Sequence, residues 1–314
     1  MAQALLANDD STYTIALFTD IHWRNGDAAD QRSAALMDAV LDAEQPDLVV
    51  FNGDTIHGGA CADPAASLRA ALAPVTARDL PWVAIFGNHD DEGALDRTAL
   101  MQVMTALPGC RAEPGPEALA GVGNYVRTVV STTGKAMAHL YFLDSHSYAR
   151  TGIGGYDWIK RDQIAWYLAT ASKLNATHGE DVPALLFCHI PLSEYNEVWD
   201  LHTCYGHKGE PICCPLVNSG MFAALHESGN MRGVFVGHDH VNDFEGTLYG
   251  IRLTFGRATG YGGYGHDDFA RGAQLIRLDA GAADYTTWLH LEGGVRVMEQ
   301  ERHDPEVERK TCIL

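Results

Sequence analysis

The chain has 314 residues, of which 41 are acidic and 22 are basic, and its formal net charge is −19 at pH 7. Contacts to nucleic-acid phosphates need clustered Lys and Arg side chains, so a surface of this charge would repel a nucleic-acid backbone. No apolar run approaches the length of a membrane span. We therefore expect neither a nucleic-acid partner nor a membrane partner.

The length of the chain suits one layered α/β domain, because no Pro-, Gly- or Ser-rich linker separates regions of different composition. We expect this domain at residues 8–298 and a charged C-terminal tail at residues 299–314. Residues 1–10 lack the basic start and the apolar core of a signal peptide. The seven Cys residues are therefore expected to be thiols in a reducing cytoplasm.

The first half of the chain alternates apolar, β-rich runs with helical patterns. Strands are expected at 14–18, 48–51 and 83–86, and helices at 31–44, 65–77 and 95–105. This order is typical of parallel strands joined by crossover helices. A turn-rich excursion follows at 114–123.

The second half begins with two runs, 124–130 and 138–144, that suit a second sheet rather than another crossover. Further helices are expected at 162–175 and 219–227, and further strands at 184–187, 233–236, 250–256, 273–279 and 285–291. The sequence thus predicts an α/β fold in which a two-sheet β-sandwich is flanked by helices.

Five of the apolar runs are followed by side chains that can bind metal ions. In chain order these side chains are Asp20, His22, Asp54, Asn88, His189, His238 and His240. Ligands of open α/β sheets usually bind in the crevice beyond the carboxyl ends of the strands, so we expect these residues to converge there. Their mixture of oxygen and nitrogen atoms suits Fe, Mn or Zn better than Ca.

The set is large enough for two divalent or trivalent metal ions. Asp54 can place one carboxylate oxygen on each ion, and the neutral Asn88 can complete a shell without quenching Lewis acidity. Two ions about 3.5 to 4 Å apart can activate a bridging hydroxide and neutralise charge that develops on a phosphoryl group. The leaving group then needs only a proton, and His89, next to Asn88, is the natural donor.

The motifs around these residues resemble those of the calcineurin-like metallophosphoesterases, and within them the single-domain group similar to plant, fungal and bacterial purple-acid-phosphatase-like proteins. The similar stretches, from about residue 14 to 275, include VFNGDTIHGG, PWVAIFGNHDDEG, YFLDSHSY, GHDHVNDF and TGYGGYG. The resemblance implies a sandwich of two β-sheets with outer helices, and an enzyme that hydrolyses small phosphate esters, with phosphomonoesters preferred. A phosphodiesterase acting on a cyclic nucleotide or another small diester is the alternative, and a nuclease and a noncatalytic scaffold are the further rivals.

The resemblance also implies how the ligands are divided. One ion would be held by Asp20, His22, Asp54 and His240, and the other by Asp54, Asn88, His189 and His238. The purple enzymes carry a Tyr three residues after the bridging Asp, where this chain has His57, and a Gly at the end of the first motif, where this chain has His22. The iron-tyrosinate colour of those enzymes is therefore not expected here.

Six further side chains are candidates for contacts with the substrate: Arg24, His57, His202, His207, Tyr261 and Tyr264. Arg24 could clamp a phosphate oxygen, and the alternative is a solvated loop Arg. His57 is either a spare ligand or a residue of a loop beside the ligands.

The remaining four candidates lie in two predicted loops. His202 and His207 lie with Cys204, Cys213 and Cys214 in a loop expected over the active site, and the alternative of a zinc site there matches no standard ligand spacing. Gly260, Gly262 and Gly265 satisfy a dinucleotide-binding pattern, but no helix follows them, so a loop is expected. In that loop, Tyr261 and Tyr264 either line the mouth of the site or pack against neighbouring residues.

Overall fold

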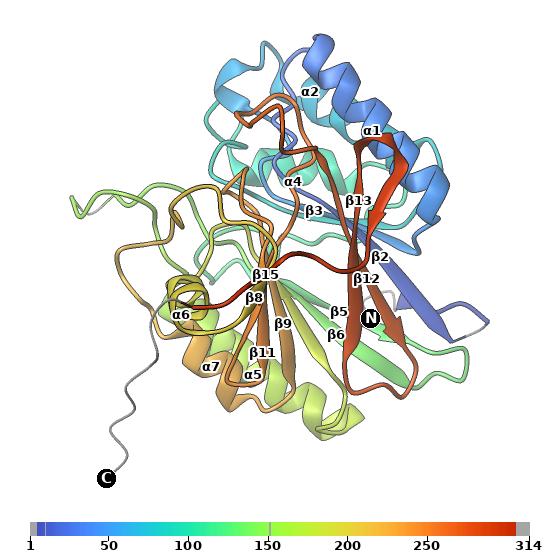
Figure 1. Ribbon diagram of the computed structural model, residues 1–314, viewed down its shortest axis with the longest axis vertical. Coiled ribbons are helices and arrows are strands. Elements are labelled where there is room, and N and C mark those ends of the chain that lie inside the picture. The colour runs from blue at the N-terminus through green and yellow to red at the C-terminus, as the bar shows by residue number, and fades with distance from the viewer. Residues whose placement is uncertain (1–4, 10, 151, 306–314) are drawn as a thin grey trace.

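The apolar runs form two stacked β-sheets in the computed structural model, which describes residues 5–9, 11–150 and 152–305 (Figure 1). The six-stranded sheet contains, in spatial order, β14 (Val295–Val297), β13 (Tyr285–Leu291), β12 (Gly272–Asp279), β2 (Thr12–Phe18), β3 (Leu48–Asn52) and β4 (Trp82–Ile85). The nine-stranded sheet contains β1 (Leu5–Leu6), β5 (Tyr125–Val130), β6 (Ala136–Phe142), β7 (Ala184–Phe187), β9 (Met231–Val236), β11 (Ile251–Phe255), β10 (Glu245–Leu248), β8 (Cys204–Tyr205) and β15 (Arg302–His303).

The predicted crossover rhythm is confirmed, since β2, β3 and β4 pair in parallel and so do β6, β7, β9 and β11. Successive residues of a strand point to opposite faces of its sheet. On β6, Leu140 and Phe142 therefore join the core between the sheets, whereas Tyr141 joins a second core on the outer face. On β7, Phe187 and Leu186 divide in the same way.

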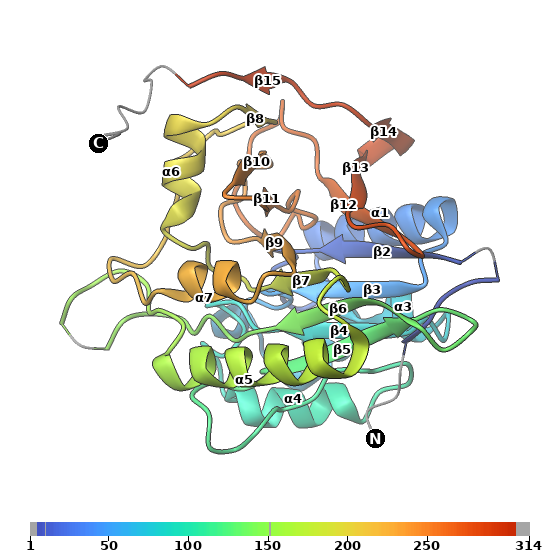
Figure 2. The same cartoon turned by 90° about the horizontal axis from the view of Figure 1, so that it is seen from below.

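Helices cover the outer faces of both sheets, as the sequence predicts. Their bounds are α1 (Ala28–Glu44), α2 (Pro64–Ala71), α3 (Ala73–Thr76), α4 (Arg97–Thr105), α5 (Arg161–His178), α6 (Glu194–Leu201) and α7 (Met221–Glu227), with short 3-10 turns η1 (Gly58–Ala60) and η2 (Glu292–Gly294). Figure 2 shows α1 beside β2 and β12, and α7 beside α5 on the other outer side. The predicted sandwich with flanking helices is confirmed.

The start of α1 also fixes the loop that leaves β2. The side chain of Asp27 accepts hydrogen bonds from the backbone N–H groups of Ala29 and Asp30, at 2.9 and 3.1 Å, and caps the helix. The buried carboxylate of Asp30 accepts in turn from the N–H groups of Arg24 and Gly26. The chain that follows the predicted ligands of β2 is thereby held in place.

Several elements differ from the prediction. The helix expected at 65–77 is two helices, because the chain turns at Leu72 and Pro74 lies in the first turn of α3, where its missing N–H group costs no hydrogen bond. Helix α6 was not predicted, and it packs beside β10. Within the predicted tail, β15 pairs with β8, and residues 306–314 lie outside the described residues.

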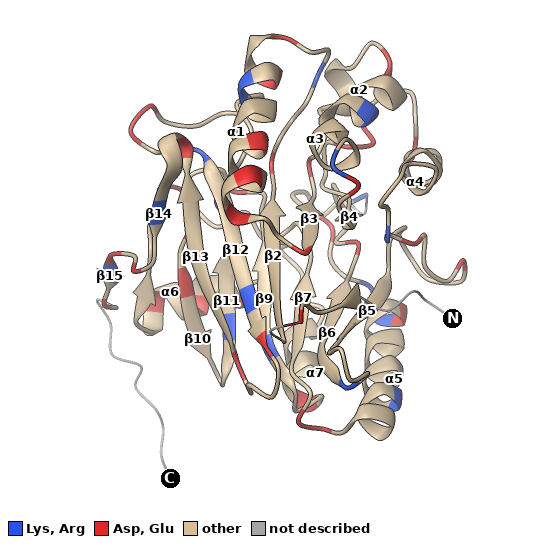
Figure 3. Cartoon of the chain, turned by 90° about the vertical axis from the view of Figure 1, so that its right-hand side faces the viewer, with Lys and Arg blue, Asp and Glu red and all other residues tan. Residues whose placement is uncertain are grey.

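None of the described helices is both long enough and apolar enough to span a membrane. The six cysteines among the described residues are free thiols, and Cys312 lies outside them. Figure 3 shows acidic residues along α1 and in several loops, with Lys and Arg residues interspersed among them.

Candidate metal centre

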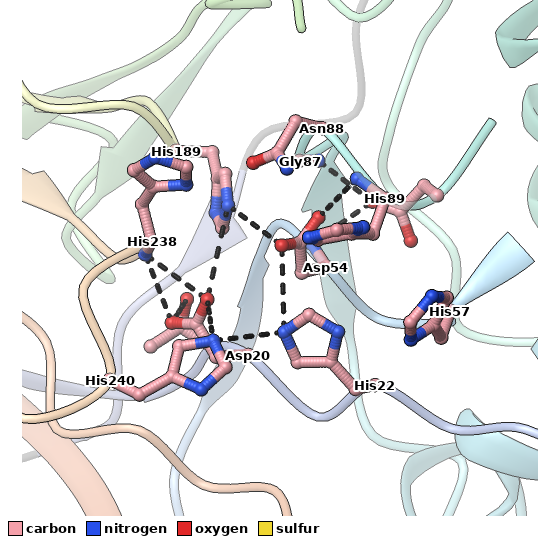
Figure 4. A network of polar contacts seen from close by, with 12 residues as sticks. Asp20, His22, Asp54, His57, Gly87, Asn88, His89, His189, His238 and His240 are labelled. Carbon is pink, nitrogen blue, oxygen red and sulfur yellow. Dashed lines mark hydrogen bonds and ion pairs between the residues drawn. The ribbon is translucent and has the colours of Figure 1, made fainter. Parts of the chain in front are cut away.

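The five strand ends singled out in the sequence meet at one edge of the two sheets (Figure 4). The six-stranded sheet contributes Asp20 and His22 after β2, Asp54 after β3 and Asn88 after β4. The nine-stranded sheet contributes His189 after β7 and His238 and His240 after β9. All seven residues are buried, with exposed fractions between 0 and 7%.

The side chains form two groups, each of which could hold a cation. Asp20, His22 and His240 make the first group, and Asp54, His189 and His238 make the second. In the first group the Nε2 atoms of His22 and His240 face each other at 3.0 Å, and Oδ1 of Asp20 lies 3.5 Å from Nε2 of His240. Atoms this close can share one ion, since metal–nitrogen bonds are about 2.0 to 2.1 Å long.

Asp54 of the second group faces both groups with a single oxygen atom. Its Oδ2 atom is 3.6 Å from Nε2 of His22 and 3.2 Å from Nε2 of His189. Its Oδ1 atom instead accepts a hydrogen bond of 2.8 Å from the backbone N–H of His89. The structure thus directs one oxygen to both groups, whereas the sequence analysis expected one oxygen for each ion.

Several buried atoms of the groups have no hydrogen-bond partner among the described residues. These atoms are Nε2 of His189, Nε2 of His238 and Oδ1 of Asn88. The opposite ring nitrogen of His189 lies 2.9 Å from the carbonyl oxygen of Asn52, an arrangement that leaves Nε2 free as a ligand atom. Buried polar atoms without partners are costly, so a bound cation that uses them fits this site.

Four residues of the site have left-handed backbone conformations, which residues other than glycine seldom adopt. Asp20, His22, Asp54 and His238 have positive φ angles of 56°, 51°, 48° and 79°. Such strain clusters at functional sites, where the surrounding structure maintains it. Gly87 shows a related constraint, because a Cβ atom there would overlap the carboxylate of Asp54. The glycine of the GNHD motif therefore makes room for the carboxylate between the groups.

Charge and burial set the protonation of the ligands. Burial lowers the pKa values of His22 and His238 well below the usual range, so both rings are neutral and able to bind a metal ion. Burial alone would also lower the pKa of His189, but the charges of Asp54 and Asp20 outweigh it and raise the pKa to about 9. A cation bound at His189 would therefore displace a proton.

The predicted proton donor has an acidic partner that the sequence analysis did not identify. The Nδ1 atom of His89 lies 2.8 Å from Oε2 of Glu92, and the hydroxyl of Tyr148 donates to Oε1 of Glu92 at 3.1 Å. Asn88 Nδ2 donates to the same hydroxyl at 3.3 Å. Glu92 and Tyr148 both lie within motifs that signal the family, but neither belongs to a periodic pattern.

Asp90 is a second residue that the sequence analysis left unassigned. Its buried carboxylate accepts hydrogen bonds from the backbone N–H groups of Asp54, Ile56 and Gly87, at 3.0, 2.9 and 2.7 Å. Burial and the nearby charge of Asp54 raise its pKa to about 7. Asp90 joins the loops that follow β3 and β4, and it thereby holds the backbone of Asp54 beside that of Gly87.

Two of the six candidate substrate residues lie beside the centre. The ring of His57 lies 5.0 Å from that of His89, measured between centroids, and Nε2 of His57 is 3.7 Å from Oε2 of Glu92. The ring of Tyr264 stacks on His240 at 4.0 Å, so it packs against a predicted ligand.

The other four candidates contact residues outside the two groups. The guanidinium of Arg24 pairs with Asp27 at 2.9 Å, and Tyr261 lies under the guanidinium of Arg32. His202 ends α6, and His207 lies near Phe269. No described metal-binding group includes either histidine or the neighbouring cysteines.

Comparisons with known proteins place this geometry in a family. Residues 13–242 match the family model described as "Calcineurin-like phosphoesterase". "Probable inactive purple acid phosphatase 14" of Arabidopsis thaliana is 33% identical over 316 residues, which cover 90% of this chain and 79% of the relative. "Phosphatase DCR2" of Saccharomyces cerevisiae is 34% identical over 273 residues, which cover 77% of this chain and 46% of the yeast protein.

Solved structures show the same fold at low sequence identity. A dimetal phosphatase from Danio rerio is 13% identical with a TM-score of 0.57, over 88% of this chain and 98% of that chain. The purple acid phosphatase PPD1 from yellow lupin seeds is 14% identical with a TM-score of 0.55, over 94% of this chain and 54% of that chain.

Proposed function

Since the chain belongs to the calcineurin-like phosphoesterase family, we propose that it is a dinuclear metal-dependent hydrolase of small phosphate esters. The observation that carries this proposal is the position of Asp54, whose Oδ2 atom faces a histidine of each group. One carboxylate oxygen that faces two groups of metal-ligating side chains suits two cations better than one. Fe, Mn and Zn are the metals that suit these ligands.

The chain supplies a complete ligand set for each ion. The first ion would be held by Asp20, His22, Asp54 and His240, and the second by Asp54, Asn88, His189 and His238. When bound, the ions supply Lewis acidity and an activated water, and they neutralise charge on the phosphoryl group. The rings of His22 and His238 are neutral, so they add no negative charge to the ligand set. A ligand set with little negative charge leaves the ions stronger Lewis acids.

His89 is proposed to protonate the leaving group. Its backbone N–H is held by Asp54, and its Nδ1 atom by Glu92. A carboxylate that holds one ring nitrogen of a histidine fixes the orientation of the ring. The side chain of His89 is 29% exposed, so a substrate can reach it.

The substrate is proposed to be a small phosphomonoester processed in the cytoplasm, with a small diester as the alternative. The excess of acidic over basic residues disfavours long polyanions such as nucleic acids. The preference for monoesters rests on family resemblance, because a two-metal core serves both classes of ester.

A noncatalytic metal-binding protein is the second candidate function. The names of three Arabidopsis thaliana relatives describe those proteins as probably inactive. This chain nevertheless retains every predicted ligand and the predicted proton donor. The retained site favours the hydrolase.

The test is hydrolysis of matched substrates by the metal-reconstituted protein. We expect Mn, Fe or Zn to restore cleavage of 4-nitrophenyl phosphate to metal-stripped protein, at a higher kcat/KM than for bis(4-nitrophenyl) phosphate. Faster cleavage of the diester would contradict the proposed monoester substrate and favour the diester alternative. Two bound ions without cleavage of either ester would favour the noncatalytic protein.

A further inference from the structure

Beside the two metal groups lies a third set of ligand side chains, which we call the His57 cluster: His57, His89 and Glu92. Each residue offers one ligand atom, and these atoms all lie within 4.8 Å of one another. The cluster shares no residue with the two groups described above. We propose that it is a separate, weaker binding site for a divalent transition-metal ion such as Zn²⁺, and that an ion bound there inhibits hydrolysis.

The distances from Glu92 to the two histidines of the His57 cluster suit one ion. Oε2 of Glu92 lies 2.8 Å from Nδ1 of His89 and 3.7 Å from Nε2 of His57. Ligand atoms that sit about 2.0 to 2.2 Å from a zinc ion can be separated by no more than about 4.4 Å. Two imidazoles and one carboxylate form a ligand set typical of zinc sites that keep an open position.

The cluster is also held in shape before any ion binds. The backbone N–H of Gly58 donates to the carbonyl oxygen of His89 at 2.8 Å, which joins the loop of His57 to that of His89 and Glu92. The contact is close, because a Cβ atom on Gly58 would lie 2.5 Å from the carbonyl oxygen of Asp90. Ligands on two joined loops need little rearrangement to bind an ion.

A hydrogen bond from a neighbouring residue fixes the orientation of the Glu92 carboxylate. Its second oxygen, Oε1, accepts from the hydroxyl of Tyr148 at 3.1 Å, and Oε2 remains directed to the two histidines. Such partners fix a ligand's orientation and contribute to metal affinity. The three side chains are 28 to 37% exposed, so an ion can enter from solvent.

Two consequences follow from the position of the cluster. The ring of His22 lies 5.8 Å from that of His57 and 5.1 Å from that of His89, so an ion here is repelled by ions in the neighbouring groups and binds more weakly than they do. The ion also takes His89 into its own coordination shell. The proposed proton donor is then withdrawn from the leaving group, and this inhibitory effect rests on the proposed function.

The test counts zinc equivalents bound by full-length, metal-stripped protein in competition with a chelating dye. We expect three equivalents for the unmodified chain, the third being the weakest. Glu92→Gln and His57→Ala should each weaken the third equivalent by at least roughly 10- to 100-fold, the cost of losing an outer-shell partner. The exposed Glu117→Gln variant is the matched control and should keep three equivalents.

Binding of only two equivalents at high zinc, or a third equivalent that survives both variants, would overturn the proposed site. Asp54→Asn separates this inference from the proposed function, because it should impair the first two ions and leave a zinc equivalent that depends on Glu92. Excess zinc should also slow hydrolysis of an alkyl phosphate more than that of a nitrophenyl phosphate. Equal slowing that persists in Glu92→Gln would contradict the inhibitory role of the cluster.

Discussion

Asp54 is the residue on which both metal groups depend. Its Oδ2 atom faces His22 and His189, and its Oδ1 atom fixes the backbone of His89. The carboxylate therefore joins the ligands of two ions to the proposed proton donor.

Replacing Asp54 with Asn should lower the occupancy of both ions together with turnover. The substitution keeps the size of the side chain but removes the negative charge shared by the two groups. Elemental analysis after dialysis measures the occupancy. Two ions that remain tightly bound in this variant would show that Asp54 does not lie between them.

Replacing His89 with Asn should keep both ions and lower turnover by roughly 10²- to 10⁴-fold, the range of general acid catalysis. The loss should be larger for an alkyl phosphate than for a nitrophenyl phosphate, because an alkoxide needs the proton and a nitrophenolate leaves almost unaided. Steady-state rates with the two esters measure this difference. Equal losses for both would remove His89 from the role of acid.

At the residue scale, the sequence predicted the ligand side chains that follow apolar runs. The end of such a run marks the end of a strand, so the position of these side chains could be predicted. It did not predict Asp90 or Glu92, although both lie in the same motif as Asn88. Asp90 has its partners in the loop of Asp54, and Glu92 contacts His57 and Tyr148 as well as His89 of its own motif. Except for His89, these partners come from other parts of the chain, and spacing along one motif cannot show them.

At the scale of elements, the loops after β3 and β4 behave as one unit. Asp90 accepts from backbone groups of both loops, and Gly58 donates across them. The strands were predictable from apolar runs, but the joining of their loops depends on three-dimensional contacts. The break at Leu72 had a local signal in Pro74, whereas short α6 had no such signal.

The contact between β6 and α5 makes a prediction about pH. His139 on β6 is buried, and its Nε2 atom lies 3.5 Å from Nδ1 of His178 at the end of α5. Burial, and to a lesser extent the charge of His178, lowers the pKa of His139 to about 4. The unfolded chain then binds the extra proton between pH 6.5 and 4, so this histidine lowers stability as the pH falls through that window.

Between pH 7 and pH 5 the contribution of His139 amounts to a loss of roughly 2 kcal/mol in the free energy of unfolding. His139→Gln should therefore show a smaller loss than the unmodified chain, by about that amount. Urea unfolding at the two pH values measures it, with the exposed His226→Gln variant as control. An unchanged loss in His139→Gln would contradict the burial argument.

At the scale of the whole molecule, the two sheets bring their strand ends to a common edge. The six-stranded sheet supplies Asp54, and the nine-stranded sheet supplies His189 and His238, so neither sheet alone completes the second group. The two-sheet architecture was predictable from the order of strands and helices. The position of β15 against β8 was not, because two residues in a charged stretch give no strand pattern.

The most direct test of the dinuclear centre is the rate of 4-nitrophenyl phosphate hydrolysis as metal-stripped protein is titrated with Mn, Fe or Zn. The rate should rise with added metal and reach its plateau at two equivalents for each chain, since one carboxylate oxygen serves both groups. A plateau at one equivalent, or no hydrolysis at any loading, would contradict a two-metal phosphoesterase.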